Sequence, residues 1–158
     1  ERGNICLFFS ILATGLSGVR PDQCLPITLD VGTNNEVFLK DPNYIGLKQK
    51  RVTGKDYDDF IDEFINAVKS TFGSTCLIQL EDFHTSNAFN LLEKYQYKAC
   101  LFDDDIQGTA SMVLSGMLTS LKITKLEVKD NVFLFYGAGE AAIGTADLIT
   151  FAMSQKGI

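Results

Sequence analysis

Apolar residues recur at intervals of three and four in the middle of the chain, and this spacing predicts an amphipathic helix. We expect the helix to begin at Asp56, a good N-cap residue, and to close at Gly73. Its acidic residues lie off the apolar stripe, which indicates a solvated face that also suits the positive end of the helix dipole. The stripe consists of Tyr57, Phe60, Ile61, Phe64, Ile65 and Val68, and the acidic face of Asp58, Asp59, Asp62 and Glu63.

Short apolar runs alternate with helix-like segments along much of the chain. We expect strands at residues 25–31, 75–80, 99–102 and 131–136. Helices are expected from Thr85 or Ser86 through Tyr95, from about residue 107 to 121, and from the glycine turn after the last strand to about residue 155. This alternation predicts an α/β fold with a mostly parallel sheet and flanking helices. In such sheets, ligands bind at the carboxyl ends of the strands.

The first part of the chain, from Ile5 to Leu16, is largely apolar. It is too short to cross a bilayer as a helix, which needs about 20 residues. Behind Arg2 it resembles the core of a signal peptide, but a buried helix is the interpretation we favour. Because Glu1 is not an initiating methionine, we expect the sequence to be an internal fragment of a longer protein.

Composition narrows the classes of protein that remain. The chain has 158 residues, of which 46% are hydrophobic and 22% charged, so a disordered or fibrous protein is excluded. Its formal net charge of −6 argues against non-specific nucleic-acid binding, which needs a basic surface. None of the four cysteines forms a C-x-x-C pair, and Cys76 and Cys100 stand in apolar runs as buried thiols do. We therefore expect an intracellular, reducing compartment, either cytosol or mitochondrion.

A glycine-rich turn follows the last expected strand. Residues 137–142 read G-A-G-E-A-A, which is the G-x-G-x-x-A form of the dinucleotide-binding fingerprint. Gly137 permits the tight turn, Gly139 lets a pyrophosphate approach the backbone, and Ala142 allows close helix–strand packing. The helix that follows offers free N–H groups to phosphates. A purely structural turn and a methyltransferase loop remain alternatives.

Acidic residues follow two of the expected strands, and together they form what we call the carboxylate cluster. A set of carboxylates suits a hard divalent cation such as Mg²⁺ or Mn²⁺. The alternatives are a solvated acidic loop and a helix N-cap at Asp105. His84, the only histidine, is expected to be a hydrogen-bonded loop residue rather than a ligand. The cluster consists of Glu81, Asp82, Asp103, Asp104 and Asp105.

Several short sequence motifs follow one another over about residues 18–150. They are R-P-D-Q-C-L-P (20–26), D-V-G-T-N (30–34), L-K-D-P (39–42), Q-K-R (49–51), Y-D-D-F-I-D-E (57–63), I-Q-L-E-D-F (78–83), N-A-F (87–89), D-D-I-Q-G-T-A (104–110) and G-A-G-E-A-A (137–142). Together these motifs resemble the malic enzymes. The resemblance implies an oxidoreductase that oxidatively decarboxylates L-malate to pyruvate and CO₂, with NAD or NADP and with Mg²⁺ or Mn²⁺.

The resemblance also implies roles for individual residues. Asp104 matches a catalytic aspartate beside the metal, and Arg20 matches an arginine that contacts the cofactor. The metal ligands are matched by Glu81, Asp82 and Asp105. The dinucleotide loop is matched by Gly137, Ala138, Gly139, Glu140 and Ala142.

The sequence departs from the family at several positions. Phe9 stands where the family has its catalytic lysine, eleven positions before Arg20. The family's catalytic tyrosine lies upstream of the matching part. Asp103 replaces a usual asparagine, and His84-Thr85 a usual glycine–asparagine pair. We therefore expect the chain alone to be inactive, and we keep a non-catalytic, malic-enzyme-like product that binds metal or associates with full-length subunits as the alternative.

The same resemblance implies a division of the chain and a set of partners. Residues 1–103 are expected to belong to a substrate and metal domain, with residues 1–17 atypical. Residues 104–158 are expected to begin a Rossmann-type NAD(P)-binding domain. We expect L-malate as the small-molecule substrate, a homo-oligomer in the complete protein, and neither nucleic acid nor membrane as a partner. An unrelated dinucleotide-dependent or methyltransferase domain is a third and weaker reading.

Overall fold

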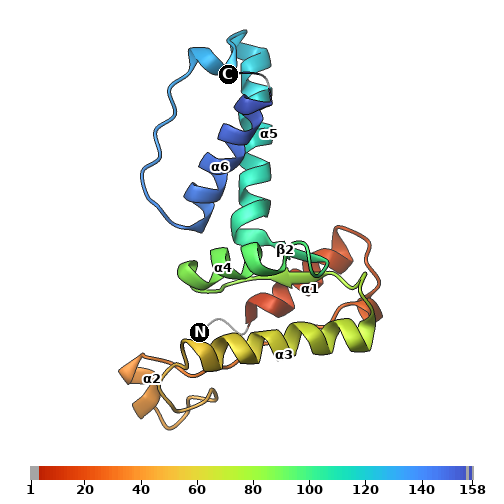
Figure 1. Cartoon of the computed structure of the whole chain (residues 1–158), viewed down its shortest axis with the longest axis vertical. Coiled ribbons are helices and arrows are strands. Elements are labelled where there is room, and N and C mark those ends of the chain that lie inside the picture. Colours follow the sequence, from red (N-terminus) through yellow and green to blue (C-terminus); the bar gives the residue numbers. More distant parts are fainter. Residues whose placement is uncertain (1–3, 156, 158) are drawn as a thin grey trace. The chain divides into compact units, whose positions relative to one another are not determined.

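A computed structural model of the chain describes residues 4–155 and 157. The chain divides into two compact units, Glu1–Gly73 and Ser74–Ile158, which we call the N-terminal unit and the C-terminal unit. The described elements of the N-terminal unit are helices and loops (Figure 1). They are α1 (Asn4–Gly15), η1 (Pro21–Gln23), α2 (Glu36–Lys40) and α3 (Lys55–Phe72).

The amphipathic helix predicted in the middle of the chain is α3, and its apolar spacing is confirmed. Tyr57, Ile61 and Ile65 are buried, one turn apart along the helix. Its N-cap is Gly54 rather than the expected Asp56, because Gly54 adopts φ 69° and turns the chain into the helix. Gly73 ends the helix with φ 90° and donates its N–H to the Lys69 carbonyl, as predicted.

The strand expected at residues 25–31 is wrong, because this segment is irregular and largely exposed. Strand-like pairing begins only where it ends. Val52 donates its N–H to the Val31 carbonyl (2.8 Å), and Thr33 donates to the Gln49 carbonyl (2.9 Å). A β-strand needs a partner that takes up its backbone groups along its length. Residues 25–30 lack such a neighbouring strand among the described residues, so β-propensity alone does not make them a strand.

The apolar start of the chain forms helix α1, as the favoured interpretation predicts. The side chains of residues 4–9 lie outside the described residues. Further along, Ile11 is 58% exposed and Leu16 is 81% exposed, so this end of the segment is not the buried helix that we expected. Across the described part of the chain, no helix combines the length and the apolar character needed to cross a membrane.

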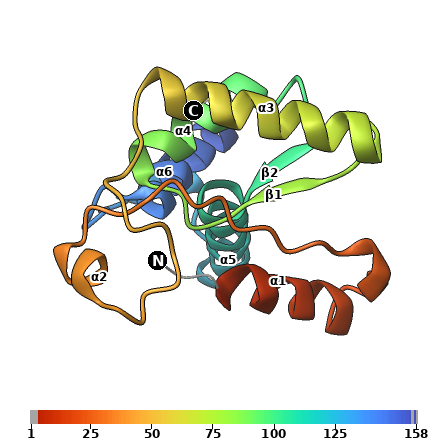
Figure 2. The same ribbon diagram turned by 90° about the horizontal axis from the view of Figure 1, so that it is seen from below.

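The C-terminal unit contains a parallel pair of strands, β1 (Ile78–Leu80) and β2 (Leu101–Asp103). Helix α4 (Thr85–Tyr95) connects them, so the three elements form a β–α–β crossover (Figure 2). The register pairs Ile78 with Leu101 and Leu80 with Asp103. The predicted α/β class with a parallel sheet is confirmed, although both strands are shorter than the apolar runs suggested.

Two long helices complete the C-terminal unit. The π-helical turn η2 (Asp104–Gly108) leads directly from β2 into α5 (Thr109–Thr124), and α6 (Glu140–Ser154) packs along α5 (Figure 1). Between them lie the 3₁₀ turn η3 (Val128–Asp130) and an extended connection. Helix α6 also packs on η2. The two helices predicted in this region are therefore confirmed, with the first divided into η2 and α5.

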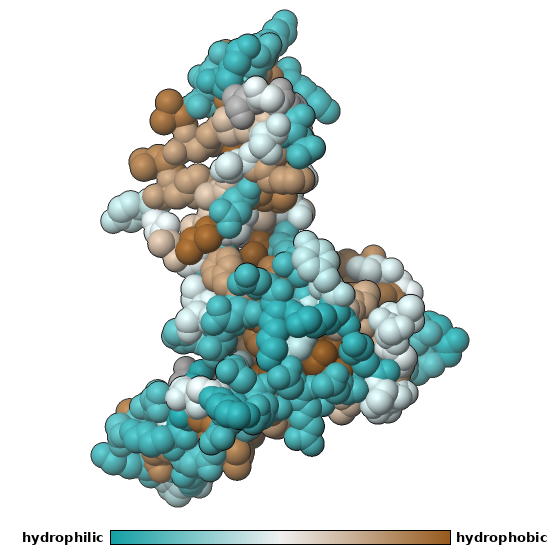
Figure 3. All heavy atoms as spheres, viewed as in Figure 1, coloured by the Kyte–Doolittle hydropathy of each residue, from teal (hydrophilic) through white to brown (hydrophobic). Residues whose placement is uncertain are grey.

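The strand expected at residues 131–136 is wrong in this structure. Val132 is 98% exposed and Leu134 is 90% exposed, and the segment runs as an extended connection to α6. Within the described residues no strand lies beside it, so its backbone has no ladder to join. Figure 3 shows hydrophobic atoms gathered over the part of the C-terminal unit that holds α5, α6 and this connection.

Candidate functional site

The carboxylate cluster lies at the carboxyl ends of β1 and β2. Glu81 and Asp82 follow β1 directly, and Asp103 is the last residue of β2. Because the register pairs Leu80 with Asp103, the two acidic segments leave the sheet at the same edge. This is the edge at which parallel sheets bind ligands, and the sequence predicted that the acidic residues would lie there.

Asp82 joins the two acidic segments through its backbone. It adopts φ 60°, the left-handed conformation that few residues other than glycine tolerate. In this conformation its N–H donates to Oδ2 of Asp105 at 3.2 Å. A non-glycine residue in this region often marks a site that the surrounding fold holds in place for function.

Asp103 is the N-cap of the π-helical turn. Its side chain is only 2% exposed, and Oδ1 accepts a hydrogen bond from the Ile106 N–H at 2.9 Å. Its own N–H donates to Oε1 of Gln107 at 3.0 Å. The sequence alternative of an N-cap at Asp105 is therefore wrong, and Asp105 is left with its carboxylate toward the end of β1.

Gly108 makes room for the carboxylate of Asp104. A Cβ atom added at Gly108 would overlap Oδ1 of Asp104 and would lie 3.0 Å from its Cγ. The Asp104 carboxylate therefore rests over the end of η2 in a space that only glycine leaves open. Sequence reasoning missed both Gln107 and Gly108. They belong to the motif D-D-I-Q-G-T-A, but their residue types do not indicate that they support Asp103 and Asp104.

Burial and crowding of like charges raise the pKa values of three carboxyl groups in the cluster. Burial, followed by repulsion from Asp105, Asp104, Asp82 and Asp103, raises the pKa of Glu81 to about 7. Burial raises the pKa of Asp103 to about 6, although the hydrogen bond from Ile106 acts in the opposite direction. Burial and the neighbouring Asp105 also raise the pKa of Asp104. At neutral pH Glu81 is therefore still partly protonated.

The chemistry of the cluster fits a hard divalent cation. All its side-chain donors are carboxylate oxygens, and Oε2 of Glu81 is buried without a hydrogen-bond partner. A buried polar atom of this kind calls for an ion, a water or a proton. Among the described residues, however, no three Asp, Glu, His or Cys side chains converge on a point where they would hold an ion together. The donor set and its location are present, whereas a preformed cage is not.

The glycine turn precedes α6 in the same unit. Gly137 has φ 132°, a conformation that favours glycine, and Gly139 is the N-cap of α6. The space beside Gly137 and Gly139 is open, and Glu140 begins the helix. Glu140 is near enough to Asp103 for its charge to raise the pKa of that carboxyl. The start of α6 therefore lies near Asp103 of the carboxylate cluster.

Two further candidate residues have local partners. Arg20 belongs to the N-terminal unit, where Nη2 forms an exposed ion pair with Oδ2 of Asp22 at 2.6 Å. His84 is the N-cap of α4, and its Nδ1 lies 3.0 Å from Oγ of Ser86. The expectation that His84 is a hydrogen-bonded loop residue is therefore confirmed.

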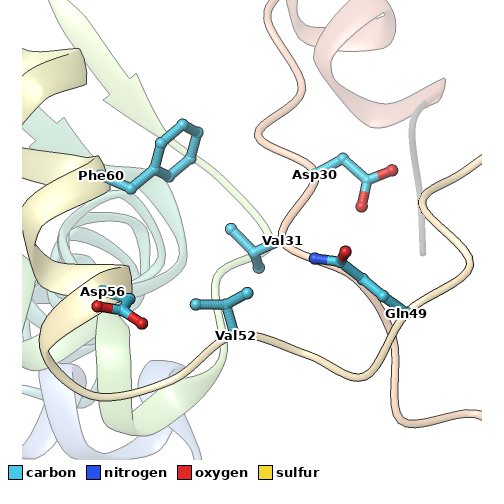
Figure 4. Close-up of a pocket in the computed structure, with 6 residues that line it drawn as sticks. All are labelled: Asp30, Val31, Gln49, Val52, Asp56 and Phe60. Atoms are coloured by element: carbon cyan, nitrogen blue, oxygen red, sulfur yellow. The ribbon is translucent and has the colours of Figure 1, made fainter.

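The N-terminal unit contains a cavity of about 220 Å³ near the start of α3 (Figure 4). Its most polar wall is Asp30, whose Oδ1 accepts from the Gly32 N–H (2.9 Å) and whose Oδ2 accepts from the Leu47 N–H (2.8 Å). These two hydrogen bonds lower the pKa of Asp30 and occupy both oxygens. Asp30 therefore anchors the loop segments at Gly32 and Leu47. The cavity is lined by Asp30, Val31, Gln49, Val52, Asp56 and Phe60.

Comparison with known proteins assigns both parts of the chain. Residues 4–96 match the family model "Malic enzyme, N-terminal domain", and residues 106–158 match "Malic enzyme, NAD binding domain". The chain is 58% identical to the NADP-dependent malic enzyme of Sus scrofa and 57% identical to that of Columba livia, over 93% of its length. It is also 57% identical to the mitochondrial NADP-dependent malic enzyme of Homo sapiens. The chain spans about a quarter of the length of these relatives: 26%, 26% and 24%, respectively.

Proposed function

This chain belongs to the malic enzyme family, and we propose that it forms part of an oxidoreductase that converts L-malate to pyruvate and CO₂ while reducing NAD or NADP. One observation carries the proposal. The carboxylate cluster at the ends of β1 and β2 and the start of α6 lie close together within one unit, because α6 packs on η2. A metal-assisted oxidation at a nicotinamide needs a site for the cation beside a site for the dinucleotide.

Glu81, Asp82 and Asp105 would hold the divalent cation. The unpartnered Oε2 of Glu81 and the closeness of Asp82 to Asp105 support this assignment. When bound, Mg²⁺ or Mn²⁺ supplies a Lewis acid for the substrate oxygens and for the negative charge that remains after CO₂ leaves. Binding a cation would also relieve the repulsion among these carboxylates and would displace the proton from Glu81.

Asp104 is proposed to hold a proton during the reaction. The raised pKa of Asp104 lies closer to neutral pH than the pKa of an ordinary aspartate, which suits a group that accepts a proton and returns it. A bound nicotinamide would take the C2 hydrogen of malate as hydride, and the proton of the C2 hydroxyl would then need a base such as Asp104. Gly108 keeps the Asp104 carboxylate at the end of η2, next to Asp105 in the chain.

The dinucleotide is proposed to bind at the glycine turn. Gly137, Ala138 and Gly139 leave the backbone accessible, and the first turn of α6 offers its N–H groups to a pyrophosphate. Glu140 and Ala142 belong to the same first turn. Arg20 is proposed as a further contact of the cofactor, released from Asp22 when phosphate is present. Like some of its relatives, the complete protein is proposed to be intracellular, and we also propose that it is a homo-oligomer.

Phe9 supports a second candidate function. A benzyl side chain cannot accept the proton that the family's lysine takes, and Phe9 lies in α1 at that position. The second candidate is therefore a non-catalytic product that binds a divalent cation or associates with full-length subunits. It shares the proposed metal site but lacks turnover.

One experiment separates the two candidates. The natural polypeptide that carries this sequence is purified, and reduction of NAD and of NADP is followed by absorbance with L-malate and Mn²⁺. If the protein is the proposed enzyme, we expect reduction of the dinucleotide only when both malate and Mn²⁺ are present. We expect no reduction in Asp105→Asn. Tight Mn²⁺ binding without any reduction supports the non-catalytic product. If the protein neither binds Mn²⁺ nor reduces a dinucleotide, both the enzyme and the metal-binding product are refuted.

A further inference from the structure

A contact between two backbone segments connects the glycine turn to the carboxylate cluster. Gly144 is buried in α6 and faces Ile106 in η2. A Cβ atom at residue 144 would lie 2.8 Å from the Ile106 carbonyl oxygen and 2.9 Å from its Cγ2. Real Cβ atoms do not approach other atoms so closely, so α6 reaches η2 only because residue 144 has no side chain.

Ile106 is held on its own side of this contact. Its N–H donates to Oδ1 of the buried Asp103 at 2.9 Å, and its carbonyl accepts from the Thr109 N–H at the end of η2. Moving Ile106 away from α6 would break one of these hydrogen bonds. A larger residue at position 144 must therefore displace α6 rather than η2.

The displaced end of α6 is the end that carries the glycine turn. Glu140 lies four residues before Gly144 and so stands on the same face of the helix. Gly139, directly before it, is the N-cap. The Gly144–Ile106 contact lies one helical turn after Glu140. It therefore sets the distance between the glycine turn and the residues Asp104 and Asp105.

We propose that Gly144 is a positioning residue, which lets α6 rest on the Ile106 carbonyl and thereby fixes the spacing between the dinucleotide loop and the carboxylate cluster. The inference rests on the proposed function, in which that spacing would place a bound nicotinamide against the C2 hydrogen of malate. Hydride transfer needs the reacting atoms about 3–3.5 Å apart, and a shift of about 1 Å costs roughly 100-fold in rate. Gly144 itself touches neither substrate nor cofactor.

The test compares Gly144→Ala with Gly116→Ala in the natural polypeptide. Gly116 lies in α5, and a Cβ atom there meets nothing within 4 Å, so it is a matched control for the added methyl group. We expect Gly144→Ala to lower kcat about 10-fold or more, to change the KM values for malate and dinucleotide little, and to raise the isotope effect with malate deuterated at C2. Gly116→Ala is expected to behave as the unaltered protein.

A structural readout needs no turnover. Deuterium uptake by the peptide covering residues 139–146 should rise in Gly144→Ala without added ligand, while uptake by α4 stays unchanged. If Gly144→Ala does not fold, the unaltered protein is used instead, and Mn²⁺ alone should alter uptake by residues 139–146. Uptake that stays the same there would overturn the proposal.

The outcomes also separate this inference from the proposed function. If the unaltered protein reduces no dinucleotide with malate and Mn²⁺, the proposed function fails. If it turns over and Gly144→Ala matches Gly116→Ala in kcat and in uptake, only the positioning role is wrong. A fall in kcat that equals the loss of folded protein, with an unchanged isotope effect, would also overturn the positioning role.

Discussion

The N–H of Asp82 donates to the carboxylate of Asp105 at 3.2 Å, and this hydrogen bond joins the ends of two neighbouring parallel strands. Asp82 reaches Asp105 because it adopts a left-handed conformation. One bond therefore brings two of the proposed metal ligands together before any cation is present. It also means that the backbone at Asp82, and not only its side chain, belongs to the site.

Asp105→Asn tests the metal assignment with little disturbance of the fold. The amide oxygen can still accept from Asp82, but the negative charge that a hard cation needs is gone. We expect the affinity for Mn²⁺ to fall by about 100-fold or more and turnover to be lost. Calorimetric titration with Mn²⁺ measures the affinity, with Asp147→Asn on the exposed side of α6 as the control. Unchanged Mn²⁺ affinity would remove Asp105 from the site.

Stability without metal should depend on pH in an unusual direction. Burial and neighbouring carboxylates raise the pKa of Glu81 from 4.5 to about 7, and burial raises the pKa of Asp103 from 3.8 to about 6. The folded chain therefore binds more protons than the unfolded chain between these values. The contribution of these two groups to the free energy of unfolding is therefore fully present below their unfolded pKa values and is lost as pH rises toward 7.

Thermal unfolding at a series of pH values, in a chelator, checks this direction. Glu81→Gln should remove part of the fall in stability between pH 4.5 and 7, the pKa limits for Glu81, because an amide stays neutral. Glu93→Gln, at an exposed position in α4, should leave the fall intact. Added Mn²⁺ should stabilise the chain more at pH 7 than at pH 5, since it competes with the protons. Stability that rises with pH in the chelator would contradict the raised pKa values.

Gly108→Ala should disturb Asp104 without touching any proposed ligand. The added Cβ atom would overlap the Asp104 carboxylate, which must then turn away from the end of η2. We expect kcat to fall about 10-fold or more if Asp104 moves a proton, with Mn²⁺ affinity nearly unchanged. Steady-state kinetics together with Mn²⁺ titration separate the two effects. Equal losses of kcat and of metal affinity would mean that the substitution distorts the whole turn.

Burial along α3 predicts a graded loss of stability. Ile61 is 3% exposed, whereas Phe60, its neighbour in the chain, is 40% exposed. Ile61→Ala should therefore lower the free energy of unfolding by about 2–5 kcal/mol, and Phe60→Ala by clearly less, despite its larger side chain. Denaturant titration of the two variants gives the comparison. An equal or reversed order would mean that the burial of Ile61 is not what stabilises α3.

The elements that were predicted correctly are those that depend on patterns among neighbouring residues. The apolar spacing of α3, the α4 start near Thr85 and the helix after the glycine turn are all present, because each depends on neighbours three or four residues apart. The placement of the carboxylate cluster also followed from the sequence. Two parallel strands separated by a helix must end at the same edge of the sheet.

The features that escaped prediction depend on contacts distant in sequence. The runs at 25–31 and 131–136 have the residue types of strands, but they lack neighbours to take up their backbone groups. The approach of Gly144 to Ile106 likewise needs two segments to be placed against one another. The type of a residue does not by itself predict such a contact.

The exposed connection before α6 should make the isolated 158-residue chain associate with itself. Leu134 is 90% exposed in an extended segment whose backbone groups have no ladder among the described residues, and such a segment pairs readily with another copy. Leu134→Lys should lower the mass measured by light scattering at rising concentration, because the charge opposes pairing. Ile123→Lys removes another highly exposed side chain (79%) from helix α5, where backbone groups are already bonded, and should lower the measured mass less. A chain that stays monomeric at every concentration would show that this segment is not an association site.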